Sequence, residues 1–194
     1  MLKALLKKIG LVRSDQAARA LYAAAVREGR RETHFDDWRV PDTVDGRFDS
    51  ISLVVALINR RIGLVNPGRR QQLQDLAQDL FDVMFADMDV NLRLLGVSDE
   101  AMKHRIKPMA AAHMGRVKAY ADALAESDEA HIIQALCAAL ARNVYREVEN
   151  PEPLPLALRM MDLARQLEAC SDDDILAGRI TFADPQPLKE GDPS

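Results

Sequence analysis

The sequence has little cysteine, few aromatic residues and no long apolar run. Its 194 residues include two cysteines, Cys137 and Cys170, and no Cys-x-x-Cys pair. This excludes a disulfide scaffold and a cysteine-rich zinc site, and predicts two buried, reduced thiols. No apolar stretch approaches the roughly 20 residues of a transmembrane helix. Aromatic residues make up 5% of the chain, which disfavours a β-rich fold because strands favour aromatic and β-branched side chains.

The sequence also lacks an excess of positive charge. Its net charge is −4, whereas nucleic-acid-binding domains are usually basic, so we expect no DNA partner. The charge is unevenly spread: residues 1–31 carry eight Lys/Arg and two Asp/Glu, and residues 145–194 carry five Lys/Arg and eleven Asp/Glu. The chain is therefore basic at its start and acidic at its end.

Alanine and leucine dominate instead, with 28 and 24 residues, and both favour helices. Apolar residues recur at three- and four-residue steps, and no stretch alternates with period two. The spacing predicts helices over 2–9, 14–28, 46–62, 67–95, 98–125, 129–147 and 155–169, with a short turn at 171–178 and a loop over 30–45. We expect Gly10 to interrupt the first pattern, and Pro108 to mark a kink or a junction between two helices.

The predicted fold is therefore all-α. It is a single helical-bundle domain of six to eight helices over residues 11–180, preceded by a basic amphipathic segment over 1–10. Residues 181–194 are rich in proline and poor in apolar side chains, which predicts a disordered tail.

The first nine residues form a short basic amphipathic pattern without the apolar region and cleavage site of a secretory signal. Lys3, Lys7 and Lys8 lie away from its leucines. One interpretation is a helix packed on the bundle or frayed in solvent. The other is transient contact with an anionic membrane surface or ribosomal RNA, which three lysines would make weak.

Residues 79–93 form the densest group of chemistry-bearing side chains. Acidic residues follow one helical stripe, and Phe81, Met84, Phe85 and Met88 follow another. One interpretation is a core helix with a solvated acidic face. The alternative is an exposed apolar and acidic groove that binds the basic, apolar segments of a client protein.

No enzyme motif is present. The chain has no nucleotide-binding glycine loop, no G-x-S-x-G and no H-E-x-x-H. It also lacks the Glu-x-x-His pairs of carboxylate-bridged di-iron bundles; the nearest pattern, Asp128-x-x-His131, more simply begins a helix. We therefore expect no catalytic residue, no metal and no cofactor.

Three segments together resemble the ubiquinol–cytochrome c chaperone family, which includes assembly factors of the cytochrome bc1 complex. They are Leu21-Tyr22-x-x-x-Val26-x-x-Gly29-Arg30, Val40-Pro41-Asp42-Thr43-Val44-Asp45-Gly46-Arg47-Phe48-Asp49, and Leu80-Phe81-Asp82-x-Met84-Phe85-x-Asp87-Met88-Asp89-x-Asn91-Leu92-Arg93 followed by Gly96-Val97. Arg142-Asn143-Val144-Tyr145 also fits. The resemblance spans about residues 15–148, and its second and third motifs are long and specific.

The resemblance implies an all-α, non-enzymatic chaperone. In that family the mitochondrial members hold newly made cytochrome b near the ribosome, together with a small partner protein. The absence of a transit peptide predicts a bacterial relative, placed in the cytoplasm or at the cytoplasmic face of the inner membrane. A generic helical adaptor unrelated to respiration is the alternative.

The client-binding interpretation assigns residues to two groups. Candidate client contacts are Phe81, Asp82, Met84, Phe85, Asp87, Met88, Asp89, Asn91 and Arg93. Candidate residues that frame the groove from the preceding loop are Trp38, Pro41, Asp42, Asp45, Arg47 and Asp49. Each of these side chains has a purely structural role as its alternative.

Overall fold

The computed structural model describes residues 2–64 and 67–185, and these residues form helices and no strand. The helices are α1 (Leu2–Gly29), α2 (Glu32–Phe35), α3 (Val44–Gly63), α4 (Arg70–Leu94), α5 (Asp99–Ala123), α6 (Glu129–Asn143), α7 (Leu154–Ala169) and α8 (Asp172–Leu176), with a 3₁₀ turn, η1 (Pro67–Arg69). The predicted all-α fold is confirmed. No helix within the described ranges combines the length and apolarity that a membrane span requires.

Helix α3 forms the centre of the bundle. It contacts α1, α4, α5 and α7, and every residue from Ile51 to Ile58 is buried. A helix that is apolar on all sides is stable only when neighbours cover all sides, so α3 organises the other helices around itself.

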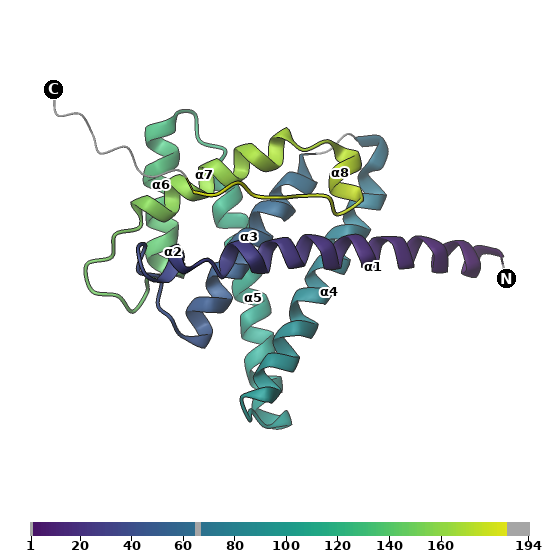
Figure 1. Cartoon of the computed structure of the whole chain (residues 1–194), viewed down its shortest axis with the longest axis horizontal. Helices are drawn as coiled ribbons and strands as arrows, with labels where there is room; N and C mark the ends of the chain where they lie inside the picture. Colours follow the sequence, from purple (N-terminus) through teal and green to yellow (C-terminus); the bar gives the residue numbers. More distant parts are fainter. Residues whose placement is uncertain (1, 65–66, 186–194) are drawn as a thin grey trace.

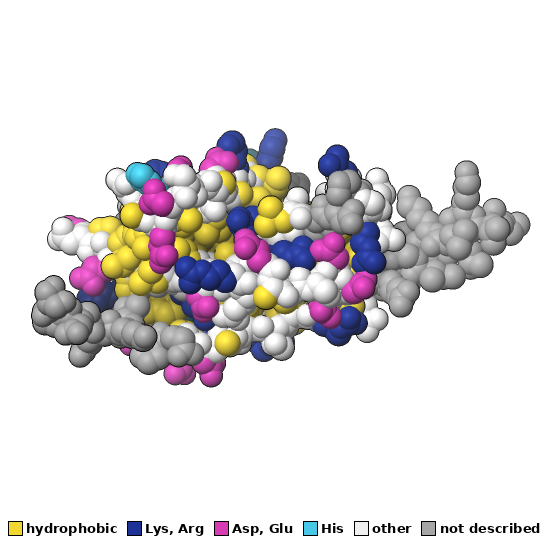
Figure 2. Space-filling view, turned by 90° about the horizontal axis from the view of Figure 1, so that it is seen from above, with side chains coloured by type: hydrophobic (Ala, Val, Ile, Leu, Met, Phe, Trp, Pro, Cys, Tyr) yellow, Lys and Arg dark blue, Asp and Glu magenta, His cyan; other side chains and the backbone are white. Residues whose placement is uncertain are grey.

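Helices α4 and α5 form a hairpin that projects away from the rest of the bundle (Figure 1). Helix α4 packs on α1, α3 and α5, and its C-terminal end lies beside α5 away from the rest of the bundle (Figure 1). Helices α6, α7 and α8 cover the opposite side (Figure 1). On the face seen in Figure 2, side chains of both charge signs are interleaved.

Three of the expected helix starts carry side-chain caps. Ser98 accepts a hydrogen bond from the Ala101 backbone N–H at 3.3 Å, and Asp128 accepts one from His131 at 3.0 Å. Thr43 does the same for Gly46 at 3.0 Å and begins α3 two residues earlier than expected. Such caps satisfy backbone N–H groups that have no partner within the helix.

Two expected interruptions are absent from the structure. Helix α1 continues through Gly10, so the separate helices over 2–9 and 14–28 are one helix, and α5 continues through Pro108. A single glycine costs a helix only about 1 kcal/mol. Pro108 and His104, whose carbonyl loses its helical donor, are both exposed, so water can take the donor's place.

Two segments are more ordered than the sequence indicated. The expected loop over 30–45 contains α2, in which the buried His34 bonds to Ser50 Oγ at 2.6 Å. At the C-terminus, Ala183 accepts a hydrogen bond from Arg159 at 2.7 Å and donates one to Gln166 at 2.9 Å. Residues 186–194 of the expected tail lie outside the described residues.

Candidate functional site

The apolar stripe of α4 lies mostly in the core. Met84, Phe85 and Met88 are buried, so the structure does not place them on an open surface. The Phe85 ring packs edge-on against Phe48 of α3, with ring centroids 6.3 Å apart. These three side chains therefore match the core-helix interpretation, because α1 and α3 cover the face that carries them.

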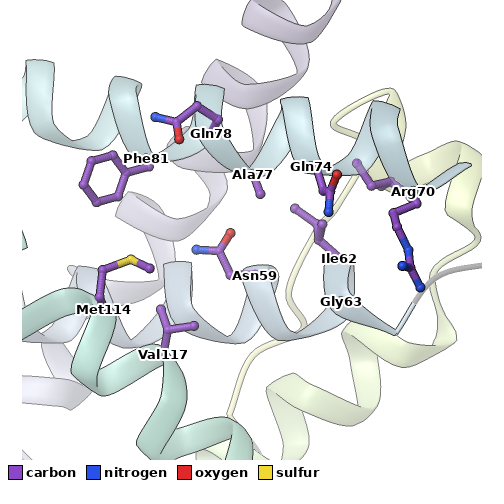
Figure 3. Close-up of a pocket in the computed structure, with 11 residues that line it drawn as sticks. Asn59, Ile62, Gly63, Arg70, Gln74, Ala77, Gln78, Phe81, Met114 and Val117 are labelled. Atoms are coloured by element: carbon purple, nitrogen blue, oxygen red, sulfur yellow. The ribbon is translucent and has the colours of Figure 1, made fainter.

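Phe81 differs from the other three because it is only partly buried and lines a groove. The groove lies between the C-terminal half of α3, the N-terminal half of α4 and the middle of α5, and its volume is about 690 Å³ (Figure 3). Its apolar lining includes Ile62, Ala77, Met114 and Val117. Met114 is 58% exposed and adds apolar surface to the groove.

Polar side chains line the groove without any carboxylate among them. Asn59 lies on the α3 side, Gln74 and Gln78 lie on α4, and Arg70 lies at one end (Figure 3). The Oδ1 atom of Asn59 is buried and has no hydrogen-bond partner. Buried acceptors are normally paired, so an occupant that donates an N–H to this carboxamide would satisfy it.

The predicted acidic contacts separate into two sets. Asp82 is exposed and accepts a hydrogen bond from Gln78 at 2.9 Å, so it lies on the α4 flank of the groove. Asp87 instead accepts a hydrogen bond from Tyr22 of α1 at 2.8 Å. Burial and this carboxylate raise the pKa of the Tyr22 hydroxyl above its usual value. Asp87 thus joins α1 to α4, away from the groove.

The remaining α4 candidates stabilise the end of the helix. Asn91 donates to the backbone carbonyl of Asp87 at 2.7 Å. Arg93 bonds to Asp89 at 2.8 Å and also pairs with Asp99 at the start of α5. These contacts lie beside a second cavity of about 580 Å³ between α4 and α5, lined by Asp89, Arg93, Asp99, Met102, Ile106 and Lys107.

The loop before α3 does not frame the groove, contrary to the expectation. Gly46 and Asn59 lie 13 positions apart on α3, which corresponds to about 20 Å along the helix axis. The loop residues act locally instead. The Trp38 ring packs 4.8 Å from the His34 ring, Asp42 bonds to Arg47 at 2.5 Å, and Asp45 is exposed near the start of α3.

Pro41 and Asp49 hold this end of the molecule together. The Pro41 carbonyl lies so close to Gly46 that a Cβ on the glycine would be 1.9 Å from it. Asp49 is buried between Arg116 at 2.6 Å and Arg146 at 2.5 Å. The contacts of residues 40–49 therefore connect the preceding loop and the start of α3 to the rest of the bundle.

Sequence reasoning missed most of the groove. Asn59 is a polar residue within the apolar pattern of α3, and Gln74 and Gln78 share one face of α4. These two features of the sequence could have indicated the polar part of the groove. The contribution of Met114 and Val117 depends on how α5 crosses α3, which no local pattern shows. Within the described ranges, no cluster of three His, Cys, Asp or Glu is placed to hold a metal ion.

The chain is similar to a known protein family and to a solved structure. A model of the ubiquinol-cytochrome C chaperone family matches residues 36–182. The chain is also similar to the crystal structure of the Cbp3 homolog from Brucella abortus, with a TM-score of 0.76 and 31% sequence identity over 95% of this chain and 97% of that chain. No match was found among curated protein sequences. The family match covers more than half of the sequence, and the chain therefore belongs to the ubiquinol-cytochrome C chaperone family.

Proposed function

We propose that this protein is a non-enzymatic assembly chaperone that binds newly synthesised cytochrome b and supports assembly of the ubiquinol–cytochrome c reductase complex. Family membership supports the role in assembly of this complex. The observation that carries the client-binding step is the open apolar groove lined by Phe81, Met114 and Val117. An apolar segment of an unassembled membrane protein gains stability by covering such side chains.

The flank of the groove favours a client with positive charge beside its apolar segment. Asp75 and Asp82 are exposed on α4 next to the groove-lining Gln74 and Gln78. Membrane helices carry Lys and Arg at their cytoplasmic ends, which would lie against these carboxylates. Of the predicted client contacts, the proposal therefore keeps Asp82 as an acidic contact and Phe81 as an apolar one.

A gene deletion tests the role in assembly. We expect a strain without this gene to contain less assembled bc1 complex, measured by native gel electrophoresis, while the cytochrome b transcript stays at its normal level. Reintroduction of the gene should restore the complex. Normal complex levels in the deletion strain would exclude the proposed role.

Photocrosslinking in cells tests the client and the surface that binds it. A photoreactive amino acid at position 114 should crosslink to cytochrome b, and the same group at position 154 on α7 serves as the control, since Leu154 is also exposed. Position 85 is unsuitable because Phe85 is buried. Partners unrelated to respiration at position 114 would favour the generic adaptor.

Other contacts remain part of the proposal. Contact with the ribosome, a small partner protein and the cytoplasmic face of the inner membrane are all compatible with the family's role. Lys3, Lys7 and Lys8 lie on the first turns of α1, whose N-terminal part projects from the bundle (Figure 1). Their surface contact stays a prediction, because the described side chains do not include them.

A further inference from the structure

The far end of the α4–α5 hairpin exposes three large apolar side chains: Val90, Leu94 and Leu95, here called the hairpin tip. Leu94 is 80% exposed, Leu95 61% and Val90 53%. The hairpin tip is the part of α4 and α5 that lies farthest from the bundle (Figure 1). Exposed apolar side chains that gather at one projecting point indicate a contact surface.

The backbone holds these leucines in place. Gly96 follows them with a φ of +80°, a conformation that favours glycine and lets the chain reverse direction. The N–H groups of Leu95 and Val97 bond back to the carbonyls of Asn91 and Leu92, at 3.2 and 3.1 Å. The leucines are thus presented by the ordered end of a helix and not by a long loop.

Positive charge follows the hairpin tip along α5. Residues 101–121 include Lys103, Arg105, Lys107, Arg116 and Lys118 but no Asp or Glu. Arg105 and Lys107 are exposed, and they lie about 9 and 12 Å along the axis from the start of α5, at a rise of 1.5 Å per residue. Phosphate groups at that height above inserted leucines would face these two cations.

The carboxylates nearest the hairpin tip offset part of this charge. Asp89 and Asp99 both pair with Arg93. Glu100 lies 3.5 Å from His104. Residues 89–107 carry four Lys/Arg and three Asp/Glu, so this end of the hairpin keeps a net charge of +1 that favours an anionic surface.

We propose that the hairpin tip docks on an anionic lipid bilayer, with Leu94 and Leu95 in the interfacial layer and Arg105 and Lys107 at the lipid phosphates. Leucines at the apex with cations set behind them form the arrangement of interfacial membrane contacts. A nucleic-acid surface would use the cations but would not require leucines. The proposal rests on the proposed function only in that a membrane-protein client places the chaperone near a bilayer.

Vesicle binding tests this proposal directly. The full chain should co-sediment with vesicles made of equal parts phosphatidylcholine and phosphatidylglycerol, and bind much less to pure phosphatidylcholine. The double variant Leu94→Ser/Leu95→Ser should lower the partition coefficient at least about tenfold, because it removes the exposed apolar area. Arg105→Glu/Lys107→Glu should lower it by at least about 25-fold, because the loss of each cation near the surface costs about fivefold and the new carboxylates are repelled by the lipid phosphates.

A matched control variant lies on α7, on the side opposite the hairpin tip (Figure 1). Leu154→Ser/Arg165→Glu changes an exposed leucine and an exposed arginine and should leave the partition coefficient unchanged. Circular dichroism and the thermal midpoint show whether each variant is folded. Since all six positions are solvent-exposed, we expect all three variants to fold like the parent chain.

Two results would overturn the proposal. One is the absence of vesicle binding by the parent chain. The other is binding that depends on Arg105 and Lys107 but not on the leucines and extends equally to a single-stranded RNA oligonucleotide, which would assign the surface to nucleic acid. Neither result bears on crosslinking of cytochrome b from position 114, so the proposed function is tested separately.

Discussion

Asp49 shows how much a single buried side chain contributes to this fold. It is 1% exposed, and burial raises its pKa while the guanidinium groups of Arg116 and Arg146 oppose that rise. Arg116 is also buried, and its Nε and Nη1 atoms have no hydrogen-bond partner. The Asp49 carboxylate is therefore the main group that compensates the buried charge of Arg116.

The substitution Asp49→Asn should consequently destabilise the protein. We expect the free energy of unfolding in urea to fall by about 3–5 kcal/mol, since an uncompensated buried charge remains. Asp42→Asn is the matched control because it removes the pair with Arg47, which is exposed to solvent and therefore contributes little to stability. Equal effects of the two substitutions would contradict the buried-charge argument.

His113 makes stability depend on pH. Its ring is buried, bonded to Ser52 at 2.8 Å, and burial together with the nearby Arg116 lowers its pKa from 6.5 to about 4. The folded state therefore binds this proton only at a lower pH than the unfolded state does. The resulting contribution of neutral His113 to the free energy of unfolding is complete above about pH 6.5 and is lost as the pH falls through 4.

We therefore expect the free energy of unfolding to fall by about 3 kcal/mol from this group between pH 7 and pH 4. His113→Gln should flatten that part of the pH profile, measured by urea unfolding at each pH. Glu28 acts at lower pH: burial would raise its pKa, but hydrogen bonds from His34, Arg159 and Arg31 lower it to about 2. An unchanged slope between pH 6.5 and 4 in the His113→Gln variant would refute the assignment.

The sequence predicted the apolar face of α4 but not which residues of that face are buried. The periodic stripe indicated that Phe81, Met84, Phe85 and Met88 share a face, but not which of them a neighbouring helix covers. Phe85 is covered because Phe48 of α3 lies 6.3 Å away, whereas Phe81 sits one turn earlier, where α3 and α4 separate to form the groove. That difference arises from the crossing of two helices and is invisible in one of them.

At the scale of elements, strong caps and long apolar patterns were reliable and single residues that break helices were not. Ser98 and Asp128 begin α5 and α6 as expected. Gly10 and Pro108 do not end helices, because the surrounding turns supply enough hydrogen bonds to continue past them. The four-residue helix α2 is too short for any periodic signal.

The joint between the preceding loop and α3 has no room for a side chain at Gly46. A Cβ there would lie 1.9 Å from the Pro41 carbonyl oxygen and 2.9 Å from its carbon. We expect Gly46→Ala to lower the free energy of unfolding by at least about 2 kcal/mol, because the backbone must shift and the Thr43 cap is disturbed.

Gly115→Ala is the natural control for this prediction. A Cβ at Gly115 meets nothing within 4 Å, and alanine favours a helix interior over glycine by about 0.5–1 kcal/mol. Thermal or urea unfolding should show opposite signs for the two substitutions. A stabilising Gly46→Ala would mean that the loop can move away from α3.

At the scale of the whole molecule, the sequence predicted one all-α unit but not the contacts that join its two ends. The buried Glu28 at the end of α1 pairs with Arg159 of α7 at 2.8 Å, across 131 positions of sequence. Arg61 of α3 donates to the Leu167 and Cys170 carbonyls at the end of α7, at 3.0 and 2.7 Å. Arginines of the N-terminal half also pair with C-terminal carboxylates: Arg31 after α1 with Asp184, and Arg60 and Arg61 of α3 with Glu168 and Asp172. The opposite charges of the two ends made such pairs possible without specifying the partners, and the Glu28–Arg159 pair has the reverse polarity.

The segment after α8 completes this closure, and its removal should be costly. It runs back across α1 and α7 (Figure 1), with Ile180 buried, Ala183 bonded to Arg159 and Gln166, and Asp184 paired with Arg31 at 2.7 Å. Burial of one isoleucine contributes about 1.5–3 kcal/mol, and each hydrogen bond adds about 1 kcal/mol. We expect deletion of residues 179–194 to lower the free energy of unfolding by about 3–5 kcal/mol.

Deletion of residues 186–194 is the matched truncation, and it separates the closing segment from the tail that the sequence predicts to be disordered. It should change the free energy of unfolding by less than about 0.5 kcal/mol, because those residues offer little apolar surface to bury. Urea unfolding of the parent and both truncated chains distinguishes the outcomes. Equal destabilisation by the two deletions would place the stabilising contacts beyond residue 185, whereas no loss from the longer one would mean that α1 and α7 hold together without the closing segment.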